Sequence, residues 1–563
     1  MKKRKKIKWW SVPAAILGLA LVLAVTLQII TWGSPIRPVF AQTAHSAEIT
    51  FTDSASPAVK GQIVNGQGTG IPALIRVFNA KNRRRWVDIA AQGYTDRNGS
   101  FSFPIAPGSY KLHVYKGSEY EYFIQDIAVQ EGRDTLCTVQ LTRIANMAER
   151  GWFAGDVHQH STYSDGANTV GEMALADVAM GLHFAVQTDH NCVEQNIPFL
   201  EACRGLDSDS GYDFLGIAGD EITTKAGHMN IWEPMDDAGA YIHIDHTGPV
   251  SGSPFADRKA AMTGIVTEMQ KYGALSVMNH PFAGDKKRQV EDGAPQSDTF
   301  LDDDLDWVDN RDLLLMYDAT EVWNGGTGFL DTMYYFGSPA KHPFEGMEIV
   351  FDQWYKLLNT GAHFPSVGSS DCHEMLGANY VEGYNELVTE VKKNFLGFLP
   401  PIPVKIACGL MGLEGGLIYQ SLDEVEYALE NTAILPGVPR NYVYTGGVLT
   451  GEAITQAIKD GKSFITSGPI LLAAIDGNMP GETAPTGNGQ SSISLDILSN
   501  KPLSKLMVIA DGELVKKMDM KNAMEYTGEV TVDLTGRQWV IVYVEGRDNY
   551  AYAYTNPIYL AQE

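Results

Sequence analysis

Residues 152–160 have the sequence Trp-Phe-Ala-Gly-Asp-Val-His-Gln-His, a short apolar run that ends in two histidines one residue apart. Side chains alternate along a strand with a period of two, so His158 and His160 leave the strand end on the same face and can reach one metal ion. Taken alone this motif is weak, because two histidines on one strand face are more often a hydrogen-bonded pair than a ligand pair. The rest of the chain decides between the two interpretations.

The same arrangement recurs along residues 150–370. Further strand-like runs, at 183–188, 214–219, 274–279, 319–323 and 364–369, each end at a segment rich in histidine or carboxylate. Between them, Val170–Met180, Arg258–Tyr272 and Phe344–Leu358 have apolar residues at helical spacing. Repeated β–α units predict a parallel sheet. Polar segments at the carboxyl end of every strand predict a barrel whose active site lies at that end.

Histidine and carboxylate without thiolate are the ligands of a hydrolytic centre that uses zinc, manganese or iron. Nine residues at or just after expected strand ends are candidates: His158, His160, Asp165, His190, Glu221, His228, His280, Asp371 and His373. Glu221 is expected at the end of an apolar strand, where its carboxylate needs a cation. Considered by itself, Glu221 could equally well bind a metal ion or form a salt bridge with a lysine or arginine. The coincidence of nine such positions favours the metal site.

A family resemblance follows from the motifs together. His158-x-His160, Thr188-Asp189-His190, His280-Pro281 and Asp371-x-His373 resemble the PHP (polymerase and histidinol phosphatase) superfamily. The finer pattern is similar to the CehA/McbA branch of metallohydrolases; it comprises Gly155–His158, Glu321–Gly325, Gly368–Asp371, Gly437–Tyr442 and Phe464–Pro469. The resemblance covers residues 150–563.

This resemblance implies a distorted β/α barrel that binds two or three divalent ions. One ion would take His158, His160, Glu221 and Asp371; a second would share Glu221 and take His280 and His228; a third would take Asp165, His190 and His373. His228 is the least secure, since its spacing from the glutamate varies among relatives. Glu221, Asp165 and His190 are expected to act in catalysis, with Glu221 as a bridge between ions.

The resemblance implies a hydrolase in which a hydroxide held between two ions attacks the substrate. A phosphoester is the expected substrate, with an ester, amide or carbamate as the alternative, and Arg440 and Asn324 are candidates for binding it. For Arg440 a surface salt bridge is the competing interpretation. A function of another class also stays open: a surface scaffold in which the flanking domains bind a glycan or protein.

The expected fold is a multidomain α/β protein, with the PHP-type barrel at 150–470 and an insertion at about 376–436. Residues 45–147 carry short strand-like runs with turns at Asn98-Gly99 and Pro107-Gly108, and they resemble the carboxypeptidase regulatory-like β-sandwich. Residues 471–563 predict a second, C-terminal β-sandwich, with a hairpin at Asp511-Gly512.

The first 41 residues predict export. Six cations among residues 2–8 precede an apolar run from about 12 to 30, and Val39-Phe40-Ala41 suits signal peptidase, so cleavage is expected before Gln42. An uncleaved membrane anchor is the alternative, because the run is close to bilayer length. The body would then be secreted or at the cell surface. Without this segment the formal charge falls from −25 to −32, which argues against nucleic acid as a partner. The expected partner is a small-molecule ester or phosphoester.

Overall fold

The computed structural model describes most of the chain outside its first 46 residues. The described residues are 47–80, 89–210, 213–224, 226–246, 255–281, 306–325, 348–376, 435–485, 489–546 and 551–561. The expected signal segment 1–41, its cleavage site and nearly all of the expected insertion at 376–436 lie outside them. Within the described residues no helix is both long and apolar enough to cross a membrane.

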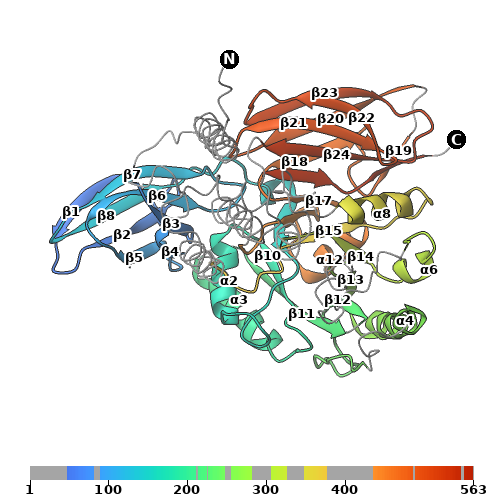
Figure 1. Cartoon of the computed structure of the whole chain (residues 1–563), viewed down its shortest axis with the longest axis horizontal. Helices are drawn as coiled ribbons and strands as arrows, with labels where there is room; N and C mark the ends of the chain where they lie inside the picture. Colours follow the sequence, from blue (N-terminus) through green and yellow to red (C-terminus); the bar gives the residue numbers. More distant parts are fainter. Residues whose placement is uncertain are drawn as a thin grey trace, which may run out of the picture.

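An N-terminal β-sandwich forms one side of the molecule, in blue in Figure 1. Its strands are β1 Glu48–Asp53, β2 Ala58–Val64, β3 Leu74–Asn79, β4 Ile89–Tyr94, β5 Ser100–Pro104, β6 Gly108–Tyr115, β7 Phe123–Val129 and β8 Arg133–Gln140. They form two four-stranded sheets, β1-β8-β2-β5 and β4-β3-β6-β7. Alternate residues such as Val59, Val77 and Leu112 are fully buried and share one apolar cluster between the sheets.

The turn at Asn98-Gly99 does not close a hairpin, contrary to the sequence prediction. It joins β4 to β5, which belong to different sheets. Asp96 organises the turn: its side chain accepts from the Asn98 amide, and its carbonyl accepts from the Gly99 amide. Gly99 has φ of +77°, so the residue types required for a tight turn are present, but the turn carries the chain across the sandwich.

A curled sheet forms the middle of the protein (Figure 1). After the short helix η1 Ala148–Arg150, its strands are β9 Trp152–Asp156, β10 Phe184–Gln187, β11 Leu215–Thr224, β12 Gly227–Trp232, β13 Leu275–Met278, β14 Ala319–Asn324 and β15 Ser366–Ser369. They lie side by side in chain order. The pairs are parallel except that β12 is antiparallel to both neighbours, so the purely parallel sheet expected from sequence is interrupted by a β11–β12 hairpin.

The described part of this sheet is a half-barrel. β9 pairs with β10 on one side and with β16 Arg440–Tyr444 on the other, so β15 remains an edge strand. Beyond the strands, the two ends of the curl are joined by a bridge between Gln159 and Cys372 and by hydrogen bonds from the His160 amide to the Cys372 carbonyl and from the Asp371 amide to the His158 carbonyl, both 3.0 Å. These contacts join two segments that carry candidate ligands.

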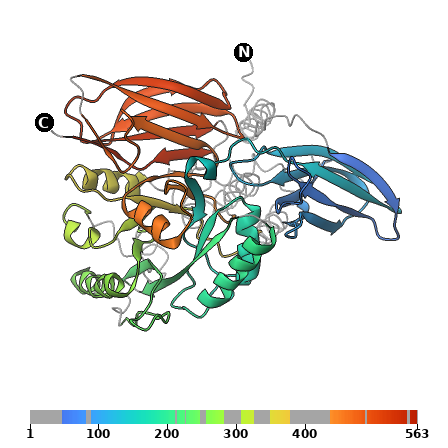
Figure 2. The same cartoon turned by 180° about the vertical axis from the view of Figure 1, so that it is seen from behind.

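Helices cover the outside of the curl (Figure 2). They are α2 Val170–Ala179, α3 Asn196–Ser210, α4 Phe255–Tyr272, α6 Arg311–Leu314, α8 Glu348–Leu358 and α12 Gly451–Lys459. A capping box between Thr169 and Glu172 starts α2. α3 packs on β11, α4 on β13, α8 on β14 and α12 on β16. The helical patterns recognised in the sequence match α2, α4 and α8 to within a few residues.

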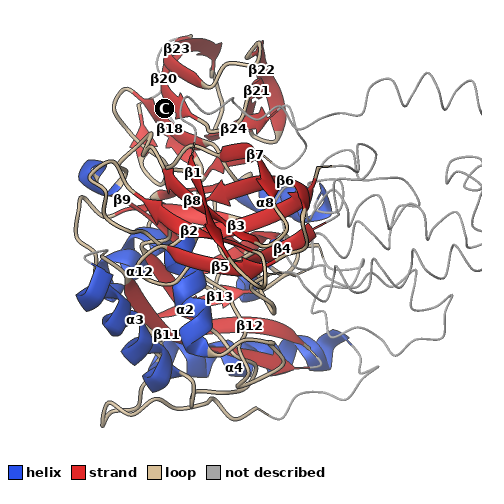
Figure 3. Ribbon diagram, turned by 90° about the vertical axis from the view of Figure 1, so that its left-hand side faces the viewer, coloured by secondary structure: helices blue, strands red, loops and turns tan. Residues whose placement is uncertain are grey.

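The C-terminal strands lie at the top of the view in Figure 3. Their hydrogen bonding continues the curled sheet. They are β17 Ser463–Thr466, β18 Ile470–Ile475, β19 Thr483–Ala484, β20 Gln490–Leu498, β21 Leu503–Ala510, β22 Glu513–Asp519, β23 Glu525–Asp533, β24 Trp539–Gly546, β25 Tyr552–Thr555 and β26 Ile558–Leu560. The order β16-β17-β25-β24-β21-β22 extends the sheet, and β18-β20-β23 forms a second layer. The Asp511-Gly512 hairpin lies between β21 and β22 as predicted, with φ of +52° and +84°.

Candidate metal centre

The two histidines that follow β9 face each other. The Nε2 atoms of His158 and His160 are 3.0 Å apart, and both side chains are fully buried. His158 Nδ1 lies 2.7 Å from Glu321 Oε1. Because a carboxylate only accepts, Nδ1 holds the ring proton and Nε2 of the neutral ring presents a lone pair toward His160.

Glu221 lies at the centre of the site, but not at a strand end as expected. β11 continues past it to Thr224, and Glu221 is paired with Asn230 of the antiparallel β12. The same hairpin places His228 opposite Thr223, which brings its ring to the side of Glu221. The hairpin therefore supplies two candidate ligands where the sequence analysis expected one strand end and a loop.

The two oxygens of Glu221 face different groups of imidazoles. Oε1 lies 3.3 Å from His158 Nε2, 3.2 Å from His228 Nδ1 and 3.3 Å from His280 Nε2. Oε2 lies 3.4 Å from His160 Nε2 and 2.6 Å from His190 Nδ1. A carboxylate divided in this way can hold one cation at each oxygen.

Asp371 and His373 come from the segment after β15. Asp371 Oδ1 lies 3.4 Å from His158 Nε2 and 3.1 Å from His160 Nε2. Asp371 has φ of +50°. A non-glycine residue rarely adopts this conformation, so the surrounding structure must hold the sharp bend.

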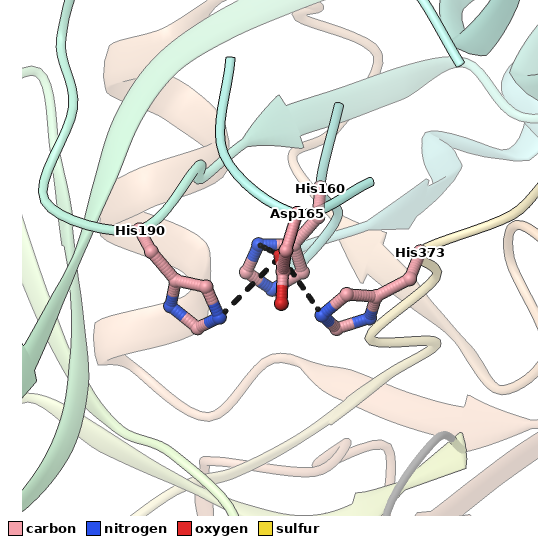
Figure 4. A group of neighbouring side chains, drawn as sticks. All are labelled: His160, Asp165, His190 and His373. Atoms are coloured by element: carbon pink, nitrogen blue, oxygen red, sulfur yellow. Dashed lines mark ion pairs between the residues drawn. The ribbon is translucent and has the colours of Figure 1, made fainter. Parts of the chain in front are cut away.

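Asp165 lies between three imidazole rings at the mouth of the site (Figure 4). Its Oδ1 is 3.3 Å from His373 Nε2, 3.7 Å from His190 Nε2 and 3.9 Å from His160 Nδ1. These residues come from the loop after β9 and the ends of β10 and β15.

The structure brings all nine candidate ligands into four overlapping groups, each with its ligand atoms within 4.8 Å of one another. The groups are His160, Asp165, His190 and His373; His158, His160 and Glu221; His158, His280 and Asp371; and His190, Glu221 and His228. His228, the least secure assignment from sequence, lies among them.

The donor set fits divalent cations. Tetrahedral coordination with bonds of about 2.0 Å separates neighbouring ligand atoms by about 3.3 Å, close to most of the spacings around Glu221. His228 Nε2 is buried yet makes no hydrogen bond within the described residues. Buried polar atoms without partners are costly, and a cation would satisfy them.

Charge inside the cluster is strongly coupled. Burial alone would lower the pKa of His158, but Asp371, Glu221 and Glu321 together raise that pKa well above its usual range. Burial alone would raise the pKa of Glu221, but His158, His228 and His190 hold it well below its usual range. The cluster therefore keeps its carboxylates ionised and pairs them with positive charge, which metal ions can supply in place of protons.

Glu321 and Asp189 occur in the motif segments but were not assigned as site residues from sequence. Besides His158, Glu321 accepts from the His280 amide at 2.8 Å and from Asn324 at 3.0 Å. Asp189 accepts from the Ser161 amide at 2.7 Å and so fixes the loop directly after His160. Both carboxylates orient ligands, and the only sequence signal for them is their place in a strand-end motif.

The two candidates for substrate binding have other positions. Asn324 is buried and donates to Glu321 and to Asp371 Oδ2, at 3.3 Å, so it orients ligands. The expectation for Arg440, a substrate-binding or surface position, is wrong. Its side chain is buried and donates to the carbonyls of Gly437 and Met180. Strand alternation explains this, because the adjacent Asn441 binds Gly368 of β15 while Arg440 lies on the other face of β16.

Metal uptake is expected to increase with pH. In the metal-free protein burial would lower the pKa of His373, but its contact with Asp165 raises that pKa to about 9. Below about pH 9 the folded protein thus carries a proton on His373 that an incoming ion must displace. Titration of the metal-free chain with Mn²⁺ from pH 6 to 9.5 should show rising affinity and proton release; an affinity independent of pH would contradict this.

Comparison with known proteins gives distant structural likenesses only. No family model and no curated protein matches the chain. A two-domain protein from Bacteroides vulgatus, described as containing a predicted PHP-like metal-dependent phosphoesterase, is 15% identical, with a TM-score of 0.32 over 72% of this chain and 95% of that one. A provisionally assigned metal-dependent phosphoesterase from Bifidobacterium adolescentis is 16% identical, with a TM-score of 0.24 over 39% and 87%.

An amidohydrolase from Chromobacterium violaceum is 15% identical, with a TM-score of 0.22 over 39% of this chain and 87% of that one. TM-scores this low describe a weak likeness. The function is therefore inferred below from the site itself.

Proposed function

We propose that this protein is an exported metal-dependent hydrolase that acts on a small phosphoester. The observation that supports it best is Glu221, whose two oxygens face separate groups of histidines. These groups would hold divalent ions. Such ions would lower the pKa of bound water to about 7 and polarise the substrate, which is the chemistry of metal-assisted hydrolysis.

The chain itself supplies position and charge. Glu321 holds the proton on His158 Nδ1 and so presents Nε2 to an ion. Asp165 and His190 lie at the more exposed side of the cluster, with side chains 58% and 23% exposed. This side offers access to a substrate.

The family assignment is part of the proposal. The curled β9–β15 sheet would be the described portion of a PHP-type distorted β/α barrel of the CehA/McbA branch, and residues 45–147 would be a carboxypeptidase regulatory-like domain. The sequence motifs support this, since each motif segment lies on or directly after a strand of one sheet.

Substrate class is tested with a panel of chromogenic phosphomonoesters, phosphodiesters, carboxylesters and carbamates, after reconstitution with manganese, zinc or iron. Hydrolysis of phosphoesters above the other classes is the expected result. Preference for a carboxylester or carbamate would replace the substrate but keep the hydrolase. Tight binding of metal without turnover of any panel member, together with tight binding of a polymer, would favour the scaffold function.

Export is tested separately. Mass spectrometry of the native protein should find an N-terminus near Gln42, because Val39 and Ala41 provide the small residues that signal peptidase selects. An intact Met1 on a membrane-bound product would favour an anchor, and an intact Met1 on a cytoplasmic product would contradict export.

A further inference from the structure

The N-terminal β-sandwich contacts the segment that carries His373. Two side chains of β4 make the contact: the Tyr94 hydroxyl donates to the Met375 carbonyl at 2.7 Å, and the Gln92 amide donates to the Leu376 carbonyl at 3.1 Å. Strand alternation puts Gln92 and Tyr94 on the same face of β4, which packs beside α2 (Figure 1). These hydrogen bonds link residues about 280 positions apart.

His373 depends on such support because no strand holds it. β15 ends at Ser369, four residues earlier. On the barrel side, the His373 carbonyl accepts from the Ala167 amide at 2.8 Å, and Asn168 Oδ1 accepts from the Met375 amide at 3.1 Å. The segment 373–376 is therefore held between the 167–168 loop and β4 of the sandwich.

The sandwich is seated firmly enough to act as a support. Buried Lys116 donates to the Val178 carbonyl at the end of α2, at 2.7 Å, and to the Pro72 carbonyl at 2.8 Å. Asn500 donates from the C-terminal strands to the Gly117 and Tyr120 carbonyls. An apolar cluster also crosses the junction; it contains Leu74, Tyr115, Tyr122, Met180, Leu435 and Val438.

We propose that the sandwich is part of the metal centre, with Tyr94 and Gln92 as positioning residues for His373. The inference rests on the metal centre proposed above and assigns the sandwich a role in holding a metal ligand. It follows that the ion held by His160, Asp165, His190 and His373 depends on β4, while the ions around Glu221 do not.

The test measures how tightly Mn²⁺ binds to the metal-free full chain. Electron paramagnetic resonance reports the concentration of the ion that remains free. Tyr94→Phe removes one hydroxyl and should weaken the binding of one ion severalfold; adding Gln92→Leu should bring the loss to about tenfold, as for other residues that orient a ligand. The matched control is Tyr110→Phe, whose hydroxyl donates to the Ala106 carbonyl at 2.7 Å inside the same sandwich. It should bind Mn²⁺ like wild type.

A double-mutant cycle separates positioning from general damage. In a His373→Ala background, Tyr94→Phe should have no further effect on Mn²⁺ affinity, because the ligand it positions is absent. An equal effect in both backgrounds, or a loss matched by Tyr110→Phe, would overturn the inference while leaving the metal centre standing. A wild-type chain that binds no Mn²⁺ would overturn the metal centre and this inference with it.

Discussion

Replacing Glu221 by glutamine is expected to lower hydrolysis by at least about a hundredfold and to reduce metal content, while the fold survives. The substitution keeps the shape of the side chain but removes the charge that both groups of histidines share. Its oxygen and nitrogen can no longer each hold a cation, and the amide would point a donor at one imidazole group. Elemental analysis and turnover of the best panel substrate measure the two effects.

Glu233→Gln is the matched control for this change. Glu233 follows β12 in the same hairpin region and accepts from the Ala218 amide at 3.1 Å and from Tyr241 at 3.2 Å, so its partners lie outside the cluster. It should keep wild-type metal content and activity. A Glu221→Gln protein with full metal content and activity within a few-fold of wild type would contradict the bridging role.

The second large effect is expected at Glu321. Glu321→Gln should lower metal affinity by about 10–100-fold, because the neutral amide no longer fixes the proton on His158 Nδ1 and can present a donor to it. The Ser369 hydroxyl also donates to Glu321 Oε1, at 2.6 Å. An amide nitrogen at this position could accept from neither Ser369 nor His158. Competition of the variant with a chelator of known affinity measures the change.

Asp318→Asn is the control for Glu321→Gln, because Asp318 precedes β14, at the opposite end from the cluster. It accepts from the Ser276 amide at 2.8 Å. This variant should bind metal normally. If Glu321→Gln and Asp318→Asn lose affinity equally, the effect belongs to the stability of β14 and not to the orientation of His158.

The nine candidate ligands were identifiable from sequence because chemistry and periodicity coincide there. Each histidine or carboxylate alone has a structural use as well, but nine of them are expected at or just after strand ends, and the carboxyl ends of neighbouring parallel strands meet at one edge of a sheet. That reasoning needs only local spacing. It also predicted α2, α4 and α8 from their apolar repeats, and the Asp511-Gly512 hairpin from the positive φ that its residues tolerate.

Local spacing was insufficient wherever pairing partners decide the outcome. The Asn98-Gly99 turn joins two sheets, and its residues alone cannot tell this from a hairpin. Arg440 and Asn441 are adjacent polar residues on one strand; which of them faces β15 depends on the register of β16 against β9. The same holds for Glu221, whose strand continues because β12 pairs with it.

The sequence by itself determined which residues could bind metal and roughly where the strands and helices lie, since both follow from residue type and short-range periodicity. Only the tertiary structure decided how these residues are arranged. It turns one oxygen of Glu221 to each histidine group and places Glu321 against His158. It also places β4 of the sandwich against the segment after His373. These contacts join residues that lie far apart in the chain. Their geometry is set by packing between elements, which no local pattern records.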